Sequence, residues 1–345
     1  MLRQRITSRD VARRAGVSRT TVSFVLNGVK EANISEATRL RVLAAAEELG
    51  YMPDAVAQAL ASGRTQTIGM VFRMYPEITV DLAHFQIIEG LMEIARQFDV
   101  RLLIDSVRQA DTAASYVKLV RTKRIDGLIL SDTRTDDRAL RDLVNDGFPI
   151  VLLGQLPDLD VCSIEFDNRG GARAAVAHLL AQGHTRVGFI GYAPAAHTGV
   201  TERLRGYQDA LATAGIAFDE SLVRYGYFSA ESGFAATMSL LDLPAPPTAL
   251  FVASDVLAFG ALAAIRERGL TVPDQIAVVG FDDHPLAQFA APPLTTVRIS
   301  FVEMGRQAGK MLLDCILQGT TPSRTVLLDA ELVVRASSVG VNRPA

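Results

Sequence analysis

The sequence predicts a small all-α head followed by a larger α/β body, and three observations predict this arrangement. The first 50 residues contain three short helical patterns with Ser, Thr or Gly at their boundaries. From Thr67 onward, short apolar runs alternate with amphipathic helical stretches. A length of 345 residues is long for a single hydrophobic core, so two or three domains are expected.

Charge divides the chain at the same place. Residues 1–64 carry 10 Lys/Arg and 6 Asp/Glu, a net charge of +4, whereas the remainder carries 25 and 32, a net charge of −7. A basic head on an acidic body suggests that only the head meets a polyanion. A solvated basic surface would have the same charge, so charge alone leaves both interpretations open.

Composition and short motifs exclude several classes of protein. No apolar run approaches the roughly 18–20 residues needed to span a bilayer, and the charged start MLRQR has no following apolar region, so it is not a secretory signal. Cys162 and Cys315 are the only cysteines and lie far apart in sequence, which favours a reduced cytoplasmic protein with two buried thiols. None of the five histidines has a partner at metal or triad spacing. No metal and no cofactor are expected.

The first two helical patterns form a helix-turn-helix. Thr7 and Asp10 have capping-box spacing, and Gly16 ends the first helix. Ser18 is then expected to cap a second helix. The residues expected to face inward are Val11, Ala12, Ala15, Val22, Val25 and Leu26. Two helices joined by a short turn that contains glycine are typical of this motif.

A third pattern closes the small core. It begins at Ser35 and ends at Gly50. Its apolar stripe is predicted to consist of Leu40, Leu43, Ala44 and Leu49.

In a helix-turn-helix the second helix enters the major groove and its first residues meet base edges. Arg19 can donate twice to guanine, and Thr20 and Thr21 offer a hydroxyl and a methyl group. Ser23 and Phe24 follow one turn later. Phosphate contacts are expected from Arg5, Arg9, Asn27 and the hydroxyls of Thr7 and Ser18.

A short helix is predicted between the head and the body. Pro53 breaks the preceding helix, Asp54 could cap a new one, and Gly63 ends it. About eight residues are too few for a stable isolated helix, so this segment is expected to form with a partner such as DNA. Leu60 is a candidate wedge between base steps in the minor groove. The alternative is a linker leucine that packs on its neighbours.

The sequence resembles the lactose-repressor (LacI/GalR) family over essentially its whole length. The residues that carry the resemblance are 10–18 (DVARRAGVS), 21–23 (TVS), 25–28 (VLNG), 49–51 (LGY) and 57–60 (AQAL). The resemblance implies that Ala57 and Leu60 also contact DNA, and that a homodimer binds a pseudo-palindromic operator. The family more often has Arg or Tyr at the position of Phe24, which cannot donate a hydrogen bond. The resemblance therefore does not define the contact made by Phe24.

The body is expected to contain parallel sheets covered by helices in two similarly built lobes. Strands are predicted at 68–72, 101–105, 127–131, 150–154, 187–190, 249–253 and 276–280, and helices at 86–98, 170–182, 203–214 and 256–268. The body resembles the periplasmic-binding-protein fold, in which the chain crosses between lobes three times. The crossings are placed near Ser163, Pro292 and Thr325.

The resulting domains are a helix-turn-helix domain (1–51), a hinge helix and linker (52–66), and an effector-binding and dimerisation domain (67–345). Within the last, one lobe comprises about 67–163 and 293–325, and the other about 164–292 and 326–345.

The resemblance also implies effector ligands. Arg203 matches the family arginine that binds effector oxygens, Asp282 matches the acidic ligand, and Phe228 lies where the family has an aromatic residue over the ligand. An arginine facing a carboxylate suits adjacent hydroxyls, as in a sugar. Asp255 is expected to cap a helix close to the cleft, and His84 lies on the first helix of the body. Weaker candidates are Ser131, Asp132 and Gln155, whereas 167–172 is interpreted as a helix start.

These features predict a ligand-responsive DNA-binding regulator, a repressor of carbohydrate uptake or catabolism genes. A sugar or sugar phosphate is the favoured effector, and a purine or another non-sugar effector is the alternative. A sugar-converting enzyme is a further alternative, but the chain lacks a GxGxxG fingerprint, a nucleophile elbow and a recognisable acid/base pair.

Overall fold

The computed structural model describes residues 6–26, 33–52, 58–59, 62–73, 82–107, 112–131, 137–156, 158–194, 197–319 and 323–339. The chain forms two compact units. The first comprises residues 1–67 together with 123–126, and the second comprises the rest.

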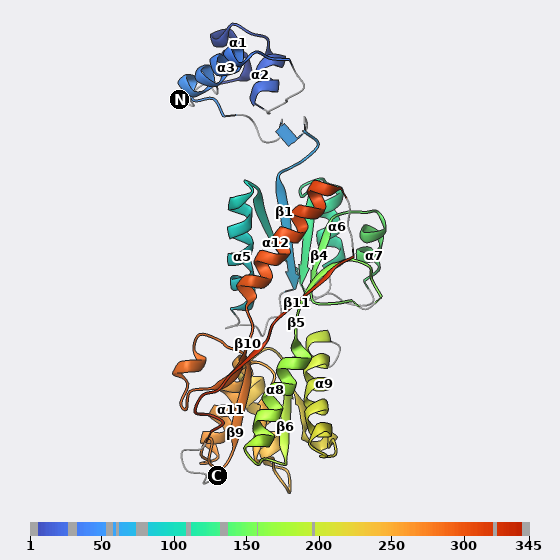
Figure 1. The fold of residues 1–345 in the computed structure, drawn as a ribbon, viewed down its shortest axis with the longest axis vertical. Helices are drawn as coiled ribbons and strands as arrows, with labels where there is room; N and C mark the ends of the chain where they lie inside the picture. The colour runs from blue at the N-terminus through green and yellow to red at the C-terminus, as the bar shows by residue number, and fades with distance from the viewer. Residues whose placement is uncertain are drawn as a thin grey trace. The chain divides into compact units, whose positions relative to one another are not determined.

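The first unit contains the predicted three-helix head, drawn in dark blue in Figure 1. Its helices are α1 (Ser8–Ala15), α2 (Arg19–Leu26) and α3 (Glu36–Leu49). The backbone N–H and the hydroxyl of Thr7 both donate to the Asp10 carboxylate, at 3.0 and 2.7 Å. Gly16 ends α1 in the left-handed conformation, which glycine adopts without steric cost. The predicted inward stripes of α1 and α2 are confirmed, because Val11, Val22 and Val25 are buried together.

The predicted stripe of α3 is wrong, although the bounds of the helix are confirmed. Leu40 and Leu43 are 59% and 44% exposed, and Ala44 is exposed as well. The buried face consists of Val42, Ala45 and Ala46, with Leu49 packed against it. The helical period admits both stripes, and the smaller residues are the ones that fit against the closely spaced α1 and α2.

The segment after the head is described only in part. Gln58, Ala59 and Ser62 are helical, and the Gly63 N–H donates to the Ala59 carbonyl at 2.9 Å. Gly63 has a φ of +71°, as expected for the residue that ends a helix. Residues 53–57, 60 and 61, and therefore Ala57 and Leu60, lie outside the described residues.

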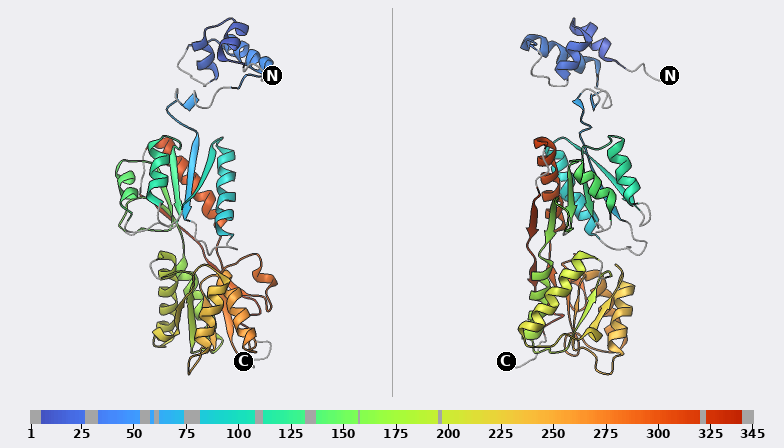
Figure 2. Two further views of the ribbon diagram at one scale, coloured as in Figure 1. Left: turned by 180° about the vertical axis from the view of Figure 1, so that it is seen from behind. Right: turned by 90° about the vertical axis from the view of Figure 1, so that its right-hand side faces the viewer.

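The second unit contains two sheets with helices on their faces (Figures 1 and 2). The first sheet has the order β11-β5-β4-β3-β1-β2 and the second β12-β10-β9-β8-β6-β7. Among the described residues, these strands pair in parallel except for β10 with β12, which are antiparallel. Strands β3, β4, β6 and β8 are buried almost throughout, which is the pattern of a parallel sheet covered on both faces.

The first lobe is built from β1 (Thr67–Arg73), α5 (Ala83–Gln97), β2 (Arg101–Val107), α6 (Thr112–Arg121), β3 (Gly127–Ser131), α7 (Arg138–Asn145), β4 (Ile150–Leu153), β5 (Cys162–Phe166), α12 (Phe301–Gln318) and β11 (Thr325–Leu328). The second is built from α8 (Asn168–Ala181), β6 (Val187–Gly191), α9 (Thr198–Thr213), η1 (Glu220–Leu222), β7 (Val223–Tyr225), α10 (Ala230–Leu241), β8 (Ala249–Val252), α11 (Asp255–Glu267), β9 (Ala277–Asp282), η2 (Ala287–Phe289), β10 (Thr295–Arg298) and β12 (Glu331–Val333).

Glycines let pairs of helices approach until their backbones touch. In the first lobe, α12 lies beside α5 although the two come from opposite ends of the body's sequence (Figure 1). A Cβ on Gly90 would lie 2.0 Å from the Val302 carbonyl oxygen, and one on Gly305 would lie 2.1 Å from that of Ile87. In the second lobe, a Cβ on Gly206 of α9 would lie 2.3 Å from the Arg169 carbonyl oxygen of α8. These contacts fix where α9 lies relative to the first turn of α8.

The chain crosses between the sheets a few residues later than predicted. Residues 164–166 and 326–328, expected in the second lobe, belong to β5 and β11 of the first sheet, and residues 293–298, expected in the first lobe, contain β10 of the second. The crossings therefore follow Phe166, Arg298 and Leu328. Turn residues such as Pro292 and Pro293 precede a strand here and do not mark the crossing itself.

Two further expectations concern the whole chain. Within the described ranges, no helix is long and apolar enough to cross a membrane. Cys162 and Cys315 are free and buried, as predicted. Although distant in sequence they are neighbours, with 3.7 Å between their sulfur atoms.

Candidate functional site

The second helix of the head presents an exposed polar face. Ser18 caps α2 through a hydrogen bond from the Thr21 N–H to its hydroxyl at 3.1 Å, and the two hydroxyls lie 2.9 Å apart. Arg19, Thr20 and Ser23 are exposed, and Phe24 is 38% exposed. The buried valines on the other side of the helix fix this orientation, so the predicted base-contacting residues share the solvent side of α2.

Other arginines of the head are engaged within it. Arg14 forms an ion pair with Glu48 of α3 at 2.7 Å, and Arg13 approaches Asp10 at 3.6 Å. Arg9 is exposed, as is Thr7. Arg5 and Asn27 were also predicted to contact phosphate, and both lie outside the described residues.

An aspartate that sequence reasoning missed binds the segment that leaves the head. The Asp126 carboxylate accepts hydrogen bonds from the N–H and hydroxyl of Thr65, at 2.7 and 3.0 Å, and from the Gln66 N–H at 2.7 Å. All three residues belong to the first unit. Three charge-assisted hydrogen bonds to one carboxylate fix the backbone of Thr65 and Gln66.

A cavity of about 220 Å³ lies between the carboxyl ends of the strands in the body. This is the position at which open α/β sheets bind ligands. It is smaller than the about 300–1,000 Å³ of drug-sized sites, so it suits a compact ligand. The residues that line it are Ala83, His84, Ile87, Ser131, Leu153, Gly154, Glu165, Phe166, Asn168, Tyr192, His197, Thr198, Gly199, Arg203, Phe228, Ser254, Val256, Asp282, Phe301 and Met304.

Arg203 of α9 is the most constrained polar residue of this cavity. Its Nε donates to Asn168 Oδ1 at 2.8 Å, and Nη1 donates to the Ala253 carbonyl at 2.6 Å and to Asp282 Oδ1 at 3.3 Å. Its guanidinium carbon lies 3.6 Å from the centroid of the Phe281 ring. Of the three guanidinium nitrogens, Nη2 alone has no hydrogen-bond partner among the described residues, so this nitrogen is the one available to a ligand oxygen.

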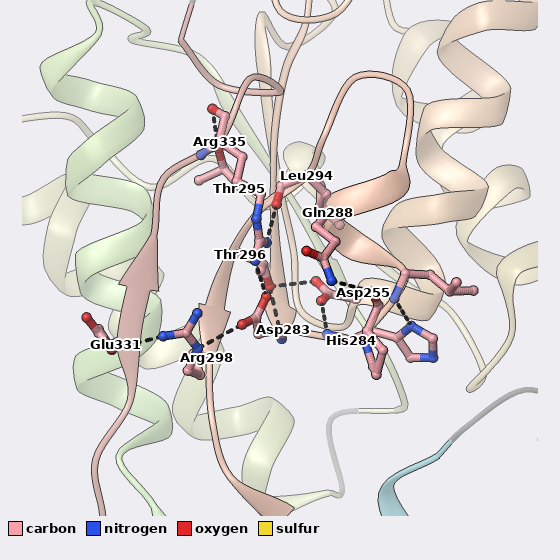
Figure 3. A network of polar contacts seen from close by, with 12 residues as sticks. Asp255, Asp283, His284, Gln288, Leu294, Thr295, Thr296, Arg298, Glu331 and Arg335 are labelled. Atoms are coloured by element: carbon pink, nitrogen blue, oxygen red, sulfur yellow. Dashed lines mark hydrogen bonds and ion pairs between the residues drawn. The ribbon is translucent and has the colours of Figure 1, made fainter.

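Asp282 ends β9 in an unusual backbone conformation. Its φ is +116°, and that of Asp283 is +52°, so two consecutive non-glycine residues lie in the positive-φ region. Such conformations persist only when the surroundings enforce them. Here Arg298 and Arg335 donate to the Asp283 carboxylate at 2.8 and 2.7 Å (Figure 3). These two arginines fix the turn that carries Asp282.

Both lobes contribute aromatic side chains to the described lining, and among them Phe166 and Phe301 meet edge-on at 5.3 Å. The rings of Phe228 and Tyr192 lie 5.6 Å apart, and His197 meets Phe228 edge-on at 5.5 Å. On the opposite lobe, His84 is stacked on Phe72 at 4.5 Å. The structure thus brings four of the five predicted effector residues, Arg203, Asp282, Phe228 and His84, to one cavity.

A carboxylate on the first lobe completes the polar wall. Glu165 of β5 lines the cavity, and its Oε1 accepts from the Asn168 side chain at 2.6 Å and from the Phe166 N–H at 3.1 Å. Asn168 connects it to Arg203. Burial raises the pKa of Glu165 to about 7, and these hydrogen bonds and the charge of Arg203 oppose the rise only in part.

Comparison with known proteins identifies the family. Residues 7–54 match the family described as "Bacterial regulatory proteins, lacI family", and residues 176–338 match "Periplasmic binding protein-like domain". The HTH-type transcriptional repressor CytR of Escherichia coli strain K12 is 36% identical, with 96% of each chain covered. The chain belongs to the LacI family.

Two solved structures of LacI-family proteins match over nearly the whole chain. The Lac repressor dimer bound to operator and an anti-inducer has a TM-score of 0.86 and 32% identity, covering 98% of this chain and all of that one. A complex of the regulator CelR with cellobiose has a TM-score of 0.75 and 34% identity, covering 96% and 100%.

One predicted effector residue of this LacI-family chain lies elsewhere. Asp255 is fully buried and does not line the cavity. Its carboxylate accepts from the His284 N–H at 2.7 Å and from the Thr296 hydroxyl at 2.6 Å (Figure 3). Burial and the nearby charge of Asp282 raise its pKa well above the ordinary value. The N-cap of α11 is Ser254 and not Asp255. The Asp255 carboxylate instead connects His284, which follows β9, with Thr296 of β10.

The weaker candidates divide in the same way. Ser131 lines the cavity, and its buried hydroxyl has no hydrogen-bond partner among the described residues. Gln155 is exposed and does not line it. Asp132 lies outside the described residues.

Sequence reasoning did not consider Glu165, and it assigned Asn168 only to the helix start at 167–172. Asp167 does cap α8, with the Gly170 N–H donating to it at 2.8 Å, so the predicted helix start is confirmed. The signal for Glu165 was present in the sequence. A glutamate within the apolar run Cys162–Phe166 is rarely buried without a partner.

Proposed function

We propose that this protein is a ligand-responsive repressor that binds DNA through α2 and responds to a small molecule in the body's cleft. The observation that carries the proposal is the presence, in one chain, of a capped helix with an exposed base-reading face and of a cavity with a preorganised arginine–carboxylate pair. A binding module without a DNA target would not need the exposed face of α2. A DNA-binding protein that does not respond to a ligand would not need the cavity.

The DNA contacts follow from the exposed side of α2. Arg19 donates twice to a guanine edge, Thr20 and Ser23 meet neighbouring base edges, and Phe24 offers an apolar contact suited to a thymine methyl group. Leu60 and Ala57 contact the minor groove between half-sites. The net charge of +4 on residues 1–64 supports an electrostatic contribution from phosphates.

A homodimer is the proposed binding form, on a pseudo-palindromic operator with half-sites about one helical turn apart. Large exposed apolar side chains support self-association: Phe85 is 72% exposed on α5 and Phe289 is 76% exposed in the second lobe. The Lac repressor, a relative, is a dimer on its operator.

The proposed effector is a sugar or sugar phosphate, and the proposed targets are genes of carbohydrate uptake or catabolism. Arg203 Nη2 and the Asp282 carboxylate can divide adjacent hydroxyls between a donor and an acceptor. Phe228 and Tyr192 offer an aromatic surface to the apolar face of a ring. The cellobiose complex of the relative CelR supports the same class. The protein acts by binding and not by catalysis.

Selection of operator DNA tests the proposal. The full-length protein is incubated with a library of random duplexes, and bound duplexes are amplified and sequenced. We expect an inverted repeat whose affinity falls steeply with salt. Arg19→Ala is expected to cost about 1–3 kcal/mol and relax specificity at one base pair. The matched control is Arg13→Ala, which removes an exposed charge from α1 and should weaken all duplexes alike. Failure to enrich any sequence would exclude the proposed function.

A further inference from the structure

Only one carboxylate oxygen of Glu165 accepts hydrogen bonds from the described residues. Oε1 accepts from Phe166 and Asn168, and Oε2 has no hydrogen-bond partner among the described residues. A Cβ built on Gly154 would lie 3.8 Å from Oε2, and Oε2 would be its nearest neighbouring atom. Gly154 has no side chain that would cover this oxygen, and both residues line the cavity. A ligand in the cavity can therefore reach Oε2.

The charges around Glu165 leave it uncompensated when ionised. The arginine of the cavity, Arg203 of α9, already forms an ion pair with Asp282 of β9. Glu202 of α9 raises the pKa of Glu165 further and forms an ion pair of its own with Arg205. The other titratable groups of the described lining are His84 of α5, Tyr192 after β6 and His197 before α9. Arg203 is therefore shared between Asp282 and an ionised Glu165, which leaves the described lining with one negative charge that Arg203 does not balance, and this is costly in a buried site.

We propose that Glu165 determines effector specificity, and that it selects a polyhydroxylated compound with a protonated amino group, of which an amino sugar is the simplest. The proposal rests on the proposed function and specifies its ligand. The ammonium group donates to Oε2 and supplies the missing positive charge. The hydroxyls lie between Arg203 Nη2 and Asp282, and the ring lies against Phe228 and Tyr192. A phosphate would face the same carboxylate and be repelled, so the sugar phosphate becomes the disfavoured class.

Proton linkage follows from the same geometry. A free Glu165 with a pKa of about 7 carries a proton through most of the range below pH 7. An ammonium ligand must displace that proton, so its affinity decreases by up to about tenfold for each pH unit below 7. Its affinity rises as the pH approaches 7 and Glu165 becomes ionised. A neutral sugar does not require the ionised form, so its affinity changes much less.

The test uses the full-length protein and matched monosaccharide sets: glucosamine, galactosamine and mannosamine, the parent hexoses, and the 6-phosphates of those hexoses. Thermal shift identifies binders, and calorimetry at about pH 5, 6 and 7 measures their dissociation constants. We expect an amino sugar to bind tightest, with affinity rising toward pH 7. Glu165→Gln should weaken it about 10–100-fold and remove the pH dependence. The control is Glu202→Gln, which removes a nearby charge outside the cavity lining and should leave the ranking unchanged.

Three results would overturn the proposal: tighter binding of a hexose or a hexose phosphate than of its amino analogue, no binding of any amino sugar, or equal affinities for the Glu165→Gln and unsubstituted proteins. Each of these is distinct from failure of the proposed function, which shows as the absence of a selected operator.

Discussion

The guanidinium of Arg203 is positioned before any ligand arrives. Its plane lies on the Phe281 ring, and two of its three nitrogens donate to Asn168, Ala253 and Asp282. The residue is only 5% exposed, yet Nη2 remains for a ligand oxygen. Because the rotamer is already fixed, binding does not have to immobilise a long side chain, a cost of about 0.5–1.5 kcal/mol in other sites. Arg203 of α9 thus connects α8 with β9 and keeps one nitrogen on the side of the cavity that it lines.

Replacing Arg203 separates the two activities of the protein. Arg203→Ala leaves the Asp282 carboxylate without its cation and removes the donor to a ligand oxygen. We expect loss of the effector response, with effector affinity weakened at least about tenfold at 1.5–3 kcal/mol per charged hydrogen bond. Operator affinity without effector should be unchanged. Fluorescence anisotropy with labelled operator measures both quantities, and Arg205→Ala, at an exposed position of the same helix, is the control. A normal response in the Arg203 variant would contradict the assignment.

At the scale of helices and strands, local patterns predict most of the molecule. Capping residues and glycines located α1, α2 and α3, and apolar runs located β3 and β6 to within a residue. Patterns could not choose between two apolar stripes on α3, because both satisfy the helical period. They also could not show that Asn168 and Arg203, 35 positions apart, form a hydrogen bond. Family resemblance predicted that Arg203, Asp282 and Phe228 contact the effector. Glu165 was missed, although a glutamate within an apolar strand was visible in the sequence.

The close contact between α8 and α9 depends on Gly206. Gly206 lies one turn beyond Arg203, and a Cβ there would be 2.3 Å from the Arg169 carbonyl oxygen and 3.0 Å from the Arg173 nitrogen. Backbone atoms cannot move aside as a flexible side chain can. Gly206→Ala is therefore expected to push α9 from α8, to cost about 1–3 kcal/mol of stability, and to weaken effector binding by lengthening the Arg203–Asn168 bond.

Urea unfolding and calorimetry with the effector would measure these two effects. Arg205→Ala again serves as the reference variant, since it changes an exposed side chain of α9 and leaves the contact between Gly206 and α8 in place. Unchanged stability of the Gly206 variant would mean that the helices can separate freely, and the close contact would then have no role in placing Arg203.

At the scale of the whole molecule, the question is how a ligand in the body alters DNA binding by the head. The sequence predicted three crossings between the lobes but placed each too early, because a local pattern cannot show with which sheet a strand pairs. The structure adds Asp126, which sequence reasoning did not single out. Its carboxylate binds Thr65 and Gln66, just before β1 begins and just before its own chain enters β3. Asp126 is therefore a candidate for transmitting the effector's signal.

The Asp126 carboxylate is expected to be required for effector coupling. Effector coupling is the ratio of operator affinities with and without ligand, typically 5–150-fold in allosteric proteins. Asp126→Ala removes all three hydrogen bonds to Thr65 and Gln66 but leaves α2 and the cleft intact. We expect the variant to bind effector with unchanged affinity and to bind operator, while its coupling ratio falls toward 1. Anisotropy titrations with the effector identified by the ligand panel measure the ratio. Asp146→Ala, an exposed aspartate at the end of α7, should keep full coupling. If the Asp126 variant also kept full coupling, the effector's signal would have to pass through other contacts, because this variant lacks the hydrogen bonds that Thr65 and Gln66 donate to Asp126.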